Sequence, residues 1–307
     1  LTFSKETVCD ILVVGGGGGG GKRHGGGGGA GTLLYHKNVI LNGDYNIKVG
    51  KGGDGISNSI RHTQHLSTNG ATDGIFSQFI KSDGTQEYKT VGGGRGTTSG
   101  ETYANTNGAQ GYLSDSTLTL SSDNKFNDTT VNVVNNLYDN SVFNLSSSKE
   151  GVHTHLGGLQ NNNFKGGGGG GAGGVGMNHD TETTIYDGYG GDGLEIDITG
   201  TSVIYAGGGS GADFNGSVAQ VYDPNKSTIG LRGGGGYGSD TGNAQNGLDG
   251  TGGGGGAQGN DGVNSSGTGG SGIVIIRFSL YDTTPLYPNY SLYTVLPWYQ
   301  QQLTNIK

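Results

Sequence analysis

The sequence is poor in the residues that stabilise most small domains. It has one cysteine, Cys9, so no internal disulfide can form. It has four prolines in 307 residues, which excludes a collagen-like triple helix. Charged residues make up 14% of the chain, too few for the highly charged composition typical of disordered segments. No apolar run approaches the ~20 residues of a membrane span, so we expect no membrane insertion.

Positive charge and helical patterning are also scarce. The net charge is −8, and the densest basic cluster is Lys22-Arg23-His24. Nucleic-acid binding depends on larger clusters of Lys and Arg, so we expect no nucleic-acid partner. Helix-forming residues never recur at the i, i+3, i+4 spacing of an amphipathic helix, which predicts a chain without substantial α-helix.

Glycine is abundant instead, with 70 residues concentrated in blocks. The first stretch, Ile11–Thr32, places four apolar residues before seven glycines, then Lys22-Arg23-His24, then five more glycines. Glycine loses more backbone entropy on folding than any other residue, so systematic hydrogen bonding must offset that cost. Further blocks occur at 92–96, 166–176, 188–193, 233–238, 251–262 and 267–272.

The first block matches a phosphate-binding pattern only superficially. Gly16 to Lys22 fits G-x-x-x-x-G-K after a strand, but Arg23 stands where Ser or Thr should bind Mg²⁺. Phosphate binding also needs a helix that begins at the glycines. Five more glycines follow Lys22, each costing about 1 kcal/mol in a helix relative to Ala. We therefore expect no phosphate site and no cofactor.

Strand signals flank the glycine blocks. Ile11–Val14 runs into the first block, and Ile273–Ile276 follows the last one, so the junction repeats in reverse order. We predict that these two runs lie in one sheet and close the domain. Asn42-Gly43-Asp44 predicts a hairpin turn with residues 45–49 as the return strand. Residues 194–211 predict two strands around Gly200.

The blocks themselves suit an extended helix with three residues per turn. Such helices can bond N–H to C=O between neighbours, and only glycine permits the close approach. The predicted fold is therefore mainly irregular and β: a polyglycine-II helix bundle bracketed by short β-strands. Lys22-Arg23-His24 would form an exposed turn between the first two helices. Loops at the ends of the bundle are free to vary and to carry recognition.

The chain divides into two predicted parts. Residues 1–280 form the glycine-rich domain, with a glycine-free insertion or long loop within 112–164. Residues 281–307 hold three of the four prolines and the only Trp, and they form a tail. Tyr and Trp are favoured at interfaces, so we interpret the tail as a docking segment. Its candidate assembly residues are Tyr287, Tyr290, Tyr293, Trp298 and Tyr299.

Metal and catalytic patterns are weak. His153-Thr-His155 could place two imidazoles on one strand face, but no Cys or carboxylate cluster accompanies them. The acidic residues between 180 and 197 lack the spacing of an EF-type calcium loop. No nucleophile motif stands on a strand–helix elbow. We expect no metal site, no catalytic residues and no enzymatic activity.

Five segments together resemble a known family: 11–31, 45–55, 166–176, 205–211 and 269–278. They are similar to the glycine-rich domain of virion proteins, seen in tailed-phage fibre adhesins and in large algal viruses. The resemblance implies a non-enzymatic surface protein of the virion, extracellular, whose inter-glycine loops bind a host glycan or protein. The tail would contact other virion proteins, and a homo-oligomer is compatible. Candidate receptor-binding residues in these loops are Tyr112, Phe126, Tyr138, Phe143, His153, His155 and Tyr186.

Two alternatives to the adhesin stay open. An architectural subunit that decorates a capsid or forms filaments would use the same fold without binding a receptor. An ice-binding protein can also use polyglycine bundles, but it needs a flat face built from near-strict triplets, and the spacing here is irregular.

Overall fold

The computed structural model describes residues 1–58, 70–98, 150–158, 166–178, 188–212, 233–260, 263–279 and 290–295. This part of the chain contains nine strands and no helix, which confirms the predicted mainly β and irregular fold class. Among the described residues, no helix is long and apolar enough to cross a membrane. The strands are β1 (Thr2–Val14), β2 (Leu33–Lys48), β3 (Gln78–Lys81), β4 (Glu87–Lys89), β5 (Gly151–His153), β6 (Leu194–Ile196), β7 (Val203–Tyr205), β8 (Ile273–Ser279) and β9 (Tyr290–Val295).

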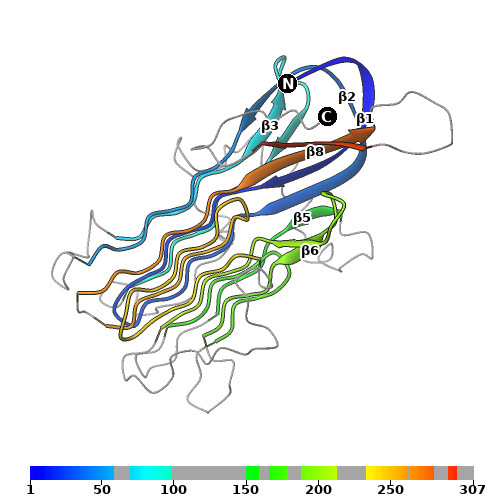
Figure 1. Ribbon diagram of the computed structural model, residues 1–307. Coiled ribbons are helices and arrows are strands. Elements are labelled where there is room, and N and C mark those ends of the chain that lie inside the picture. The colour runs from blue at the N-terminus through cyan, green and yellow to red at the C-terminus, as the bar shows by residue number, and fades with distance from the viewer. Residues whose placement is uncertain are drawn as a thin grey trace.

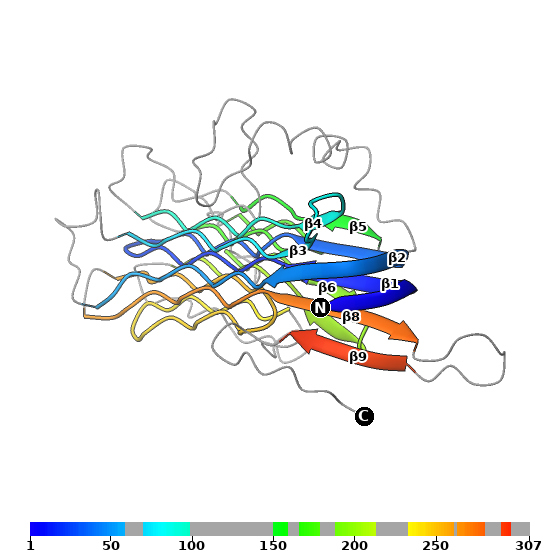
Figure 2. The same ribbon diagram turned by 90° about the horizontal axis from the view of Figure 1, so that it is seen from above.

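Seven strands form one antiparallel sheet at one end of the molecule (Figures 1 and 2). Their order is β4-β3-β2-β1-β8-β9, and β5 also pairs with β2. β1 and β8 are neighbours, with Ile11 opposite Ile276 and Val14 opposite Ile273. The prediction that these two runs close the domain in one sheet is confirmed. β6 and β7 form a separate two-stranded sheet around Gly200, as predicted.

The predicted hairpin at Asn42-Gly43-Asp44 is wrong. β2 continues through these residues, and Gly43 lies opposite Phe3 of β1. The long first strand supplies a partner for this part of β2, so the chain has no need to reverse. Gly43 has a φ of 91° and lies next to a register shift in the β1–β2 pairing. The positive φ that favours a turn here accommodates an irregularity in the sheet instead.

Apolar side chains cover both faces of the large sheet. Alternate residues of β1 point to opposite faces. Leu12 and Val14 join one cluster with β6 and β7, while Ile11 and Val13 join another with β2 and β3. Near β3, Phe79 is fully buried, whereas Phe76 and Ile80 are half-buried.

The glycine segments are the extended stretches that leave the sheet and return to it (Figure 1). They run roughly side by side as a bundle, and the first turn reverses the chain between two of them. They comprise residues 15–21, 25–32, 49–56, 70–77, 90–98, 154–158, 166–178, 188–193, 206–212, 233–248, 251–259 and 264–272.

Hydrogen bonds in the first glycine segment repeat every three residues. The donors along 15–21 turn in sequence toward segments 25–32, 70–77 and 264–272. Its carbonyls accept from three other segments: 49–56, 90–98 and 251–259. The first segment therefore has six bonded neighbours and no side chains of its own. The donor bonds are Gly15 to Thr32, Gly16 to Ile75, Gly17 to Gly270, Gly18 to Gly29, Gly19 to Thr72, Gly20 to Gly267 and Gly21 to Gly26, all 2.9–3.0 Å.

The segments pack too closely for any side chain. A Cβ added at Gly18 would lie 2.0 Å from the carbonyl oxygen of Gly94, and one at Gly28 would lie 2.1 Å from that of Gly18. Both distances are far inside van der Waals contact, and the obstructing atoms belong to the backbone. Glycine is therefore required at these positions by the spacing between segments.

Candidate binding surface at the loop end of the bundle

The described turns 22–24 and 239–242 lie, with the ends of other glycine segments, at the end of the bundle away from the sheet, here called the loop end (Figure 1). Turns 172–174 and 249–251 connect glycine segments next to the sheets instead. Backbone hydrogen bonds bring its turns together: His24 N–H donates to the Gly259 carbonyl, and Gly26 N–H donates to that of Thr97. Likewise, Gly211 N–H donates to the Gly188 carbonyl. Loops widely separated in sequence therefore emerge from one surface.

The turn Lys22-Arg23-His24 lies at the loop end, as predicted, but its predicted exposure is wrong for two of the three residues. Lys22 is fully buried and His24 is 6% exposed. Neighbouring segments end around them: Lys22 Nζ donates to the Ser57 carbonyl at 3.5 Å, and Lys22 N–H donates to Thr98 Oγ1 at 3.3 Å. Arg23 and His24 both have φ near 57°, which reverses the chain within three residues.

A buried glutamine joins two turns of this surface. Gln258 is fully buried, and its Nε2 donates to the Gly242 carbonyl. Its Oε1 accepts from the N–H of Asn260 at 2.9 Å. In addition, Asn264 Nδ2 donates to the Thr241 carbonyl at 3.2 Å. These side-chain bonds fix the turns around 241 and 260 relative to each other.

Sequence reasoning missed Gln258, although a signal was present. It follows Ala257 in the stretch 251–262 and is the first long side chain after five glycines. A long polar residue within a glycine block must find hydrogen-bond partners when neighbouring segments bury it. The loop end thus has a buried, hydrogen-bonded polar base around Gln258.

Most predicted receptor-binding residues lie outside the described part of the chain, and so do three of the predicted tail residues. Their roles stay predictions. They are Tyr112, Phe126, Tyr138, Phe143, Tyr186, Tyr287, Trp298 and Tyr299.

The two predicted loop histidines lie near the sheet rather than at the loop end. His153 is the last residue of β5 and pairs with Leu33 of β2. His155 follows in a glycine segment, where its Nδ1 lies 3.0 Å from the Gly171 carbonyl oxygen. Within the described ranges, no group of three or more His, Cys, Asp or Glu side chains is placed to hold a metal ion.

Two predicted tail residues belong to a strand of the large sheet. Tyr290 lies opposite Ser279, and Tyr293 lies opposite Ile276, both in the pairing of β9 with β8. β9 is the last strand in the sheet order and lies beside β8 in Figure 2. The described part of the predicted tail thus extends the chain's own sheet.

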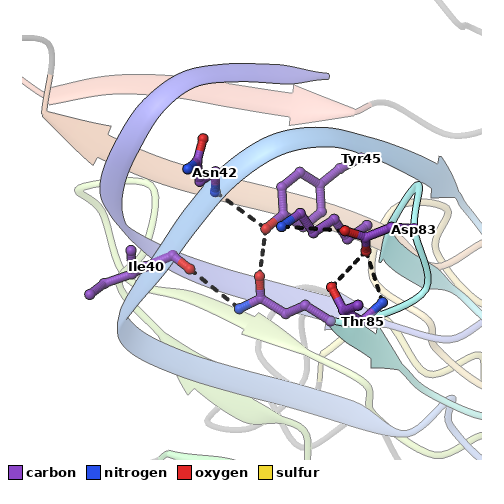
Figure 3. Close-up of polar contacts among 7 residues, drawn as sticks. Ile40, Asn42, Tyr45, Asp83 and Thr85 are labelled. Atoms are coloured by element: carbon purple, nitrogen blue, oxygen red, sulfur yellow. Dashed lines mark hydrogen bonds and ion pairs between the residues drawn. The ribbon is translucent and has the colours of Figure 1, made fainter.

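The sheet end carries a polar network between β2 and the β3–β4 hairpin (Figure 3). The Tyr45 hydroxyl donates to Gln86 Oε1 at 2.5 Å, and Gln86 Nε2 donates to the Ile40 carbonyl at 3.3 Å. Next to it, Thr85 donates to Asp83 Oδ1 from its hydroxyl and its backbone N–H. These two bonds lower the pKa of Asp83, because they favour its charged form.

The buried ionisable side chains of the sheet are held in their neutral forms. Burial, and secondarily the charge of Asp10, raises the pKa of the Cys9 thiol to about 12. Burial raises the pKa of Tyr205 to about 12 as well. A thiol that stays protonated is a poor nucleophile. Cys9 therefore behaves as a small apolar core residue.

The fold defines a class of protein: an antiparallel sheet from which hydrogen-bonded glycine segments extend as a bundle. The chain belongs to the glycine-rich domain family, whose sequence model matches residues 1–279. The match ends with the last residue of β8. Neither the curated proteins nor the solved structures contain a significant match.

Proposed function

We propose that this chain is a non-enzymatic attachment protein of a virion surface, in which a rigid glycine bundle presents loops to a host glycan or protein. The observation that carries the proposal is that glycine segments distant in sequence end together, away from the sheet. Recognition is commonly carried by loops on a rigid scaffold, because the scaffold tolerates changes in the loops. The virion assignment rests on the family resemblance of the glycine blocks and is part of the proposal.

The glycine segments, in this proposal, are polyglycine-II helices. Their hydrogen-bond partners change with a period of three residues, the period of this helix. Six bonded neighbours around the first segment fit parallel and antiparallel helices packed side by side. A far-ultraviolet circular dichroism spectrum dominated by α-helix would contradict this conformation.

The attachment role is tested by shortening one connection. We would replace residues 102–146 by a short Gly-Ser linker and apply the labelled protein to bacterial and microalgal cells and to a printed glycan array. The expected result is loss of wild-type binding with an unchanged thermal unfolding midpoint. If neither the wild type nor any variant binds these probes while the protein still assembles, the attachment role is wrong.

An architectural subunit without a receptor is the second candidate. Strand β9 favours it, since an edge strand offers backbone groups that another chain can pair with. Deleting residues 282–307 separates the two candidates. Loss of assembly with retained cell binding supports the attachment protein, and loss of assembly in a chain that never bound cells supports the architectural subunit.

A further inference from the structure

The last glycine segment, 264–272, lies at one face of the bundle, where side chains accept some of its backbone hydrogen bonds. Along it, the backbone donors again point in three directions with a period of three. Ser266, Gly269 and Gly272 donate to the carbonyls of segment 49–56. Gly267 and Gly270 donate to those of segment 251–259. Both of these directions are occupied by a neighbouring backbone.

The third direction is filled by side chains instead. Ser265, Thr268 and Ser271 donate their N–H groups to the Oδ1 atoms of Asn243, Asn246 and Asp249, at 2.9, 2.9 and 2.8 Å. Donors and acceptors both advance by three residues, with a constant separation of 22 along the chain. The three acceptors, here called the Asx ladder, occupy a direction in which the first glycine segment has a backbone neighbour.

The stretch of chain that carries the ladder also bonds the carbonyl groups of Ser265, Thr268 and Ser271. Ala244, Gly247 and Gly250 donate their N–H groups to the carbonyls of Ser265, Thr268 and Ser271, at 2.9, 2.7 and 3.0 Å. Each ladder residue and its successor thus bond both polar groups of one residue in segment 264–272. In this way the N–H and C=O groups of Ser265, Thr268 and Ser271 are all satisfied by the ladder segment.

In two other places a side-chain oxygen also accepts from a backbone N–H group where a backbone carbonyl could do so. Asp54 N–H donates to Thr72 Oγ1 at 2.7 Å, and Arg95 N–H donates to Asp73 Oδ1 at 2.9 Å. Side-chain oxygens thus accept from backbone donors in segments 49–56 and 90–98 as well. The substitution is a recurring feature of this bundle.

An uncapped glycine segment would behave as the edge strand of a sheet does. A row of unpaired N–H groups at regular spacing is a template for adding another chain with the same spacing. In this protein the best-matched chain is a second copy, since its glycine segments have the same three-residue period. The ladder removes the donors that such a copy would need.

We propose that Asn243, Asn246 and Asp249 end the hydrogen-bonded bundle on this face and prevent lateral addition of a second copy. Asn243, Asn246 and Asp249 are exposed, whereas Ala244 and Gly247, which lie between them in sequence, are buried. Asn and Asp suit the task because one short side chain carries an acceptor within reach of a neighbouring backbone. Their role is to satisfy the last donors while exposing only side-chain atoms to solvent.

The experiment compares ladder variants of the full chain. In N243A/N246A/D249A, we expect the amides of Ser265, Thr268 and Ser271 to exchange with deuterium about tenfold faster, the effect of losing one ordinary hydrogen bond at each. The amides of Gly267 and Gly270, bonded to backbone carbonyls, should keep their rates. Sedimentation velocity should show concentration-dependent dimers and larger species.

Two controls keep the test independent of folding. N246D retains an oxygen acceptor and should keep the slow exchange of Thr268, whereas N246A should lose it. Q245A removes an exposed side chain from the same segment and should change neither exchange nor association. Unchanged exchange in N246A would overturn the ladder as the acceptor, and a strictly monomeric triple variant with fast exchange would overturn its role in preventing lateral addition.

Discussion

The sheet end and the glycine bundle satisfy their backbone hydrogen bonds and fill their interiors in different ways. In the sheet, backbone groups pair in one plane and apolar side chains cover the two faces, as with Leu12 and Ile11. In the bundle, a segment such as 15–21 bonds in three directions through its donors alone and buries no side chain. The core of the sheet is made of apolar side chains, whereas many positions inside the bundle, such as Gly18 and Gly28, have no room for a Cβ.

The largest expected effect comes from adding one methyl group inside the bundle. A Cβ at Gly169 would lie 2.0 Å from the carbonyl oxygen of Gly28, a backbone atom held by neighbours on other sides. We expect Gly169→Ala to lower the free energy of unfolding by about 3 kcal/mol or more. Chemical denaturation would measure the loss.

Gly174, in the same glycine block, provides the matched control. The nearest atom to a Cβ there is the Asp192 nitrogen at 3.5 Å, an ordinary contact. Gly174→Ala should change the free energy of unfolding by less than about 1 kcal/mol, in the stabilising direction, because alanine restricts the unfolded chain. Equal losses for both variants would contradict the spacing argument.

A loss of similar size is expected from a cavity in the sheet. Leu12 is fully buried between the large sheet and β6–β7. Leu12→Ala should cost about 2–5 kcal/mol, depending on how far its neighbours relax. Val8→Ala, on the same strand but 55% exposed, should change stability by only about 0.5 kcal/mol. Denaturation midpoints of the two variants test the sheet side of the comparison.

The ion pair that links β1 to β8 should contribute less to the free energy of unfolding than the buried Leu12 side chain does. Arg277 Nη2 lies 2.5 Å from Asp10 Oδ2, with the two side chains 23% and 14% exposed. Arg277→Ala should cost about 1–2 kcal/mol, between the values for exposed and buried pairs. A double-mutant cycle with Asp10→Ala isolates the pair. Lys51–Asp54, at 3.0 Å but more than half exposed, should give a coupling near zero.

The smallest effect is a pH dependence at His36. Burial lowers the pKa of this histidine below 6.5, against a smaller opposing effect from Glu150. The unfolded state therefore binds the proton more readily, so the neutral side chain stabilises the fold above pH 6.5 and loses that advantage as the pH falls. The unfolding free energy of the wild type minus that of His36→Gln should decrease on acidification. A difference that increases would show that the fold raises the pKa of His36 instead of lowering it.

The two strands that close the domain could be predicted from the sequence, because apolar side chains distinguish them from the glycine blocks. Ile11–Val14 and Ile273–Ile276 are runs of β-branched and apolar residues beside glycine, and both became paired strands. It failed at Asn42-Gly43, where the local turn signal was overridden by pairing with the distant strand β1. It also placed Lys22 in solvent, since nothing in the sequence shows that segments ending near Ser57 and Thr98 surround it.

The order of the glycine segments could not be predicted at all. Glycine has no side chain, so a block contains no pattern that selects its neighbours. Only the residues between blocks carry that information, and Asn243, Asn246 and Asp249 are an example. Their three-residue spacing matches that of Ser265, Thr268 and Ser271, and the two sets are bonded in register. Such paired triplets outside the glycine runs are the signal to look for in related sequences.

The six neighbours of the first glycine segment have a consequence for how a cell makes this protein. Gly17 bonds to Gly270, and Gly20 bonds to Gly267, so these early glycines need partners that are synthesised far later. A repeat protein can grow unit by unit, because each unit contacts only its neighbours in sequence. Here segment 15–21 can pair early with segment 25–32, but its bonds to segment 264–272 must wait until that segment is made.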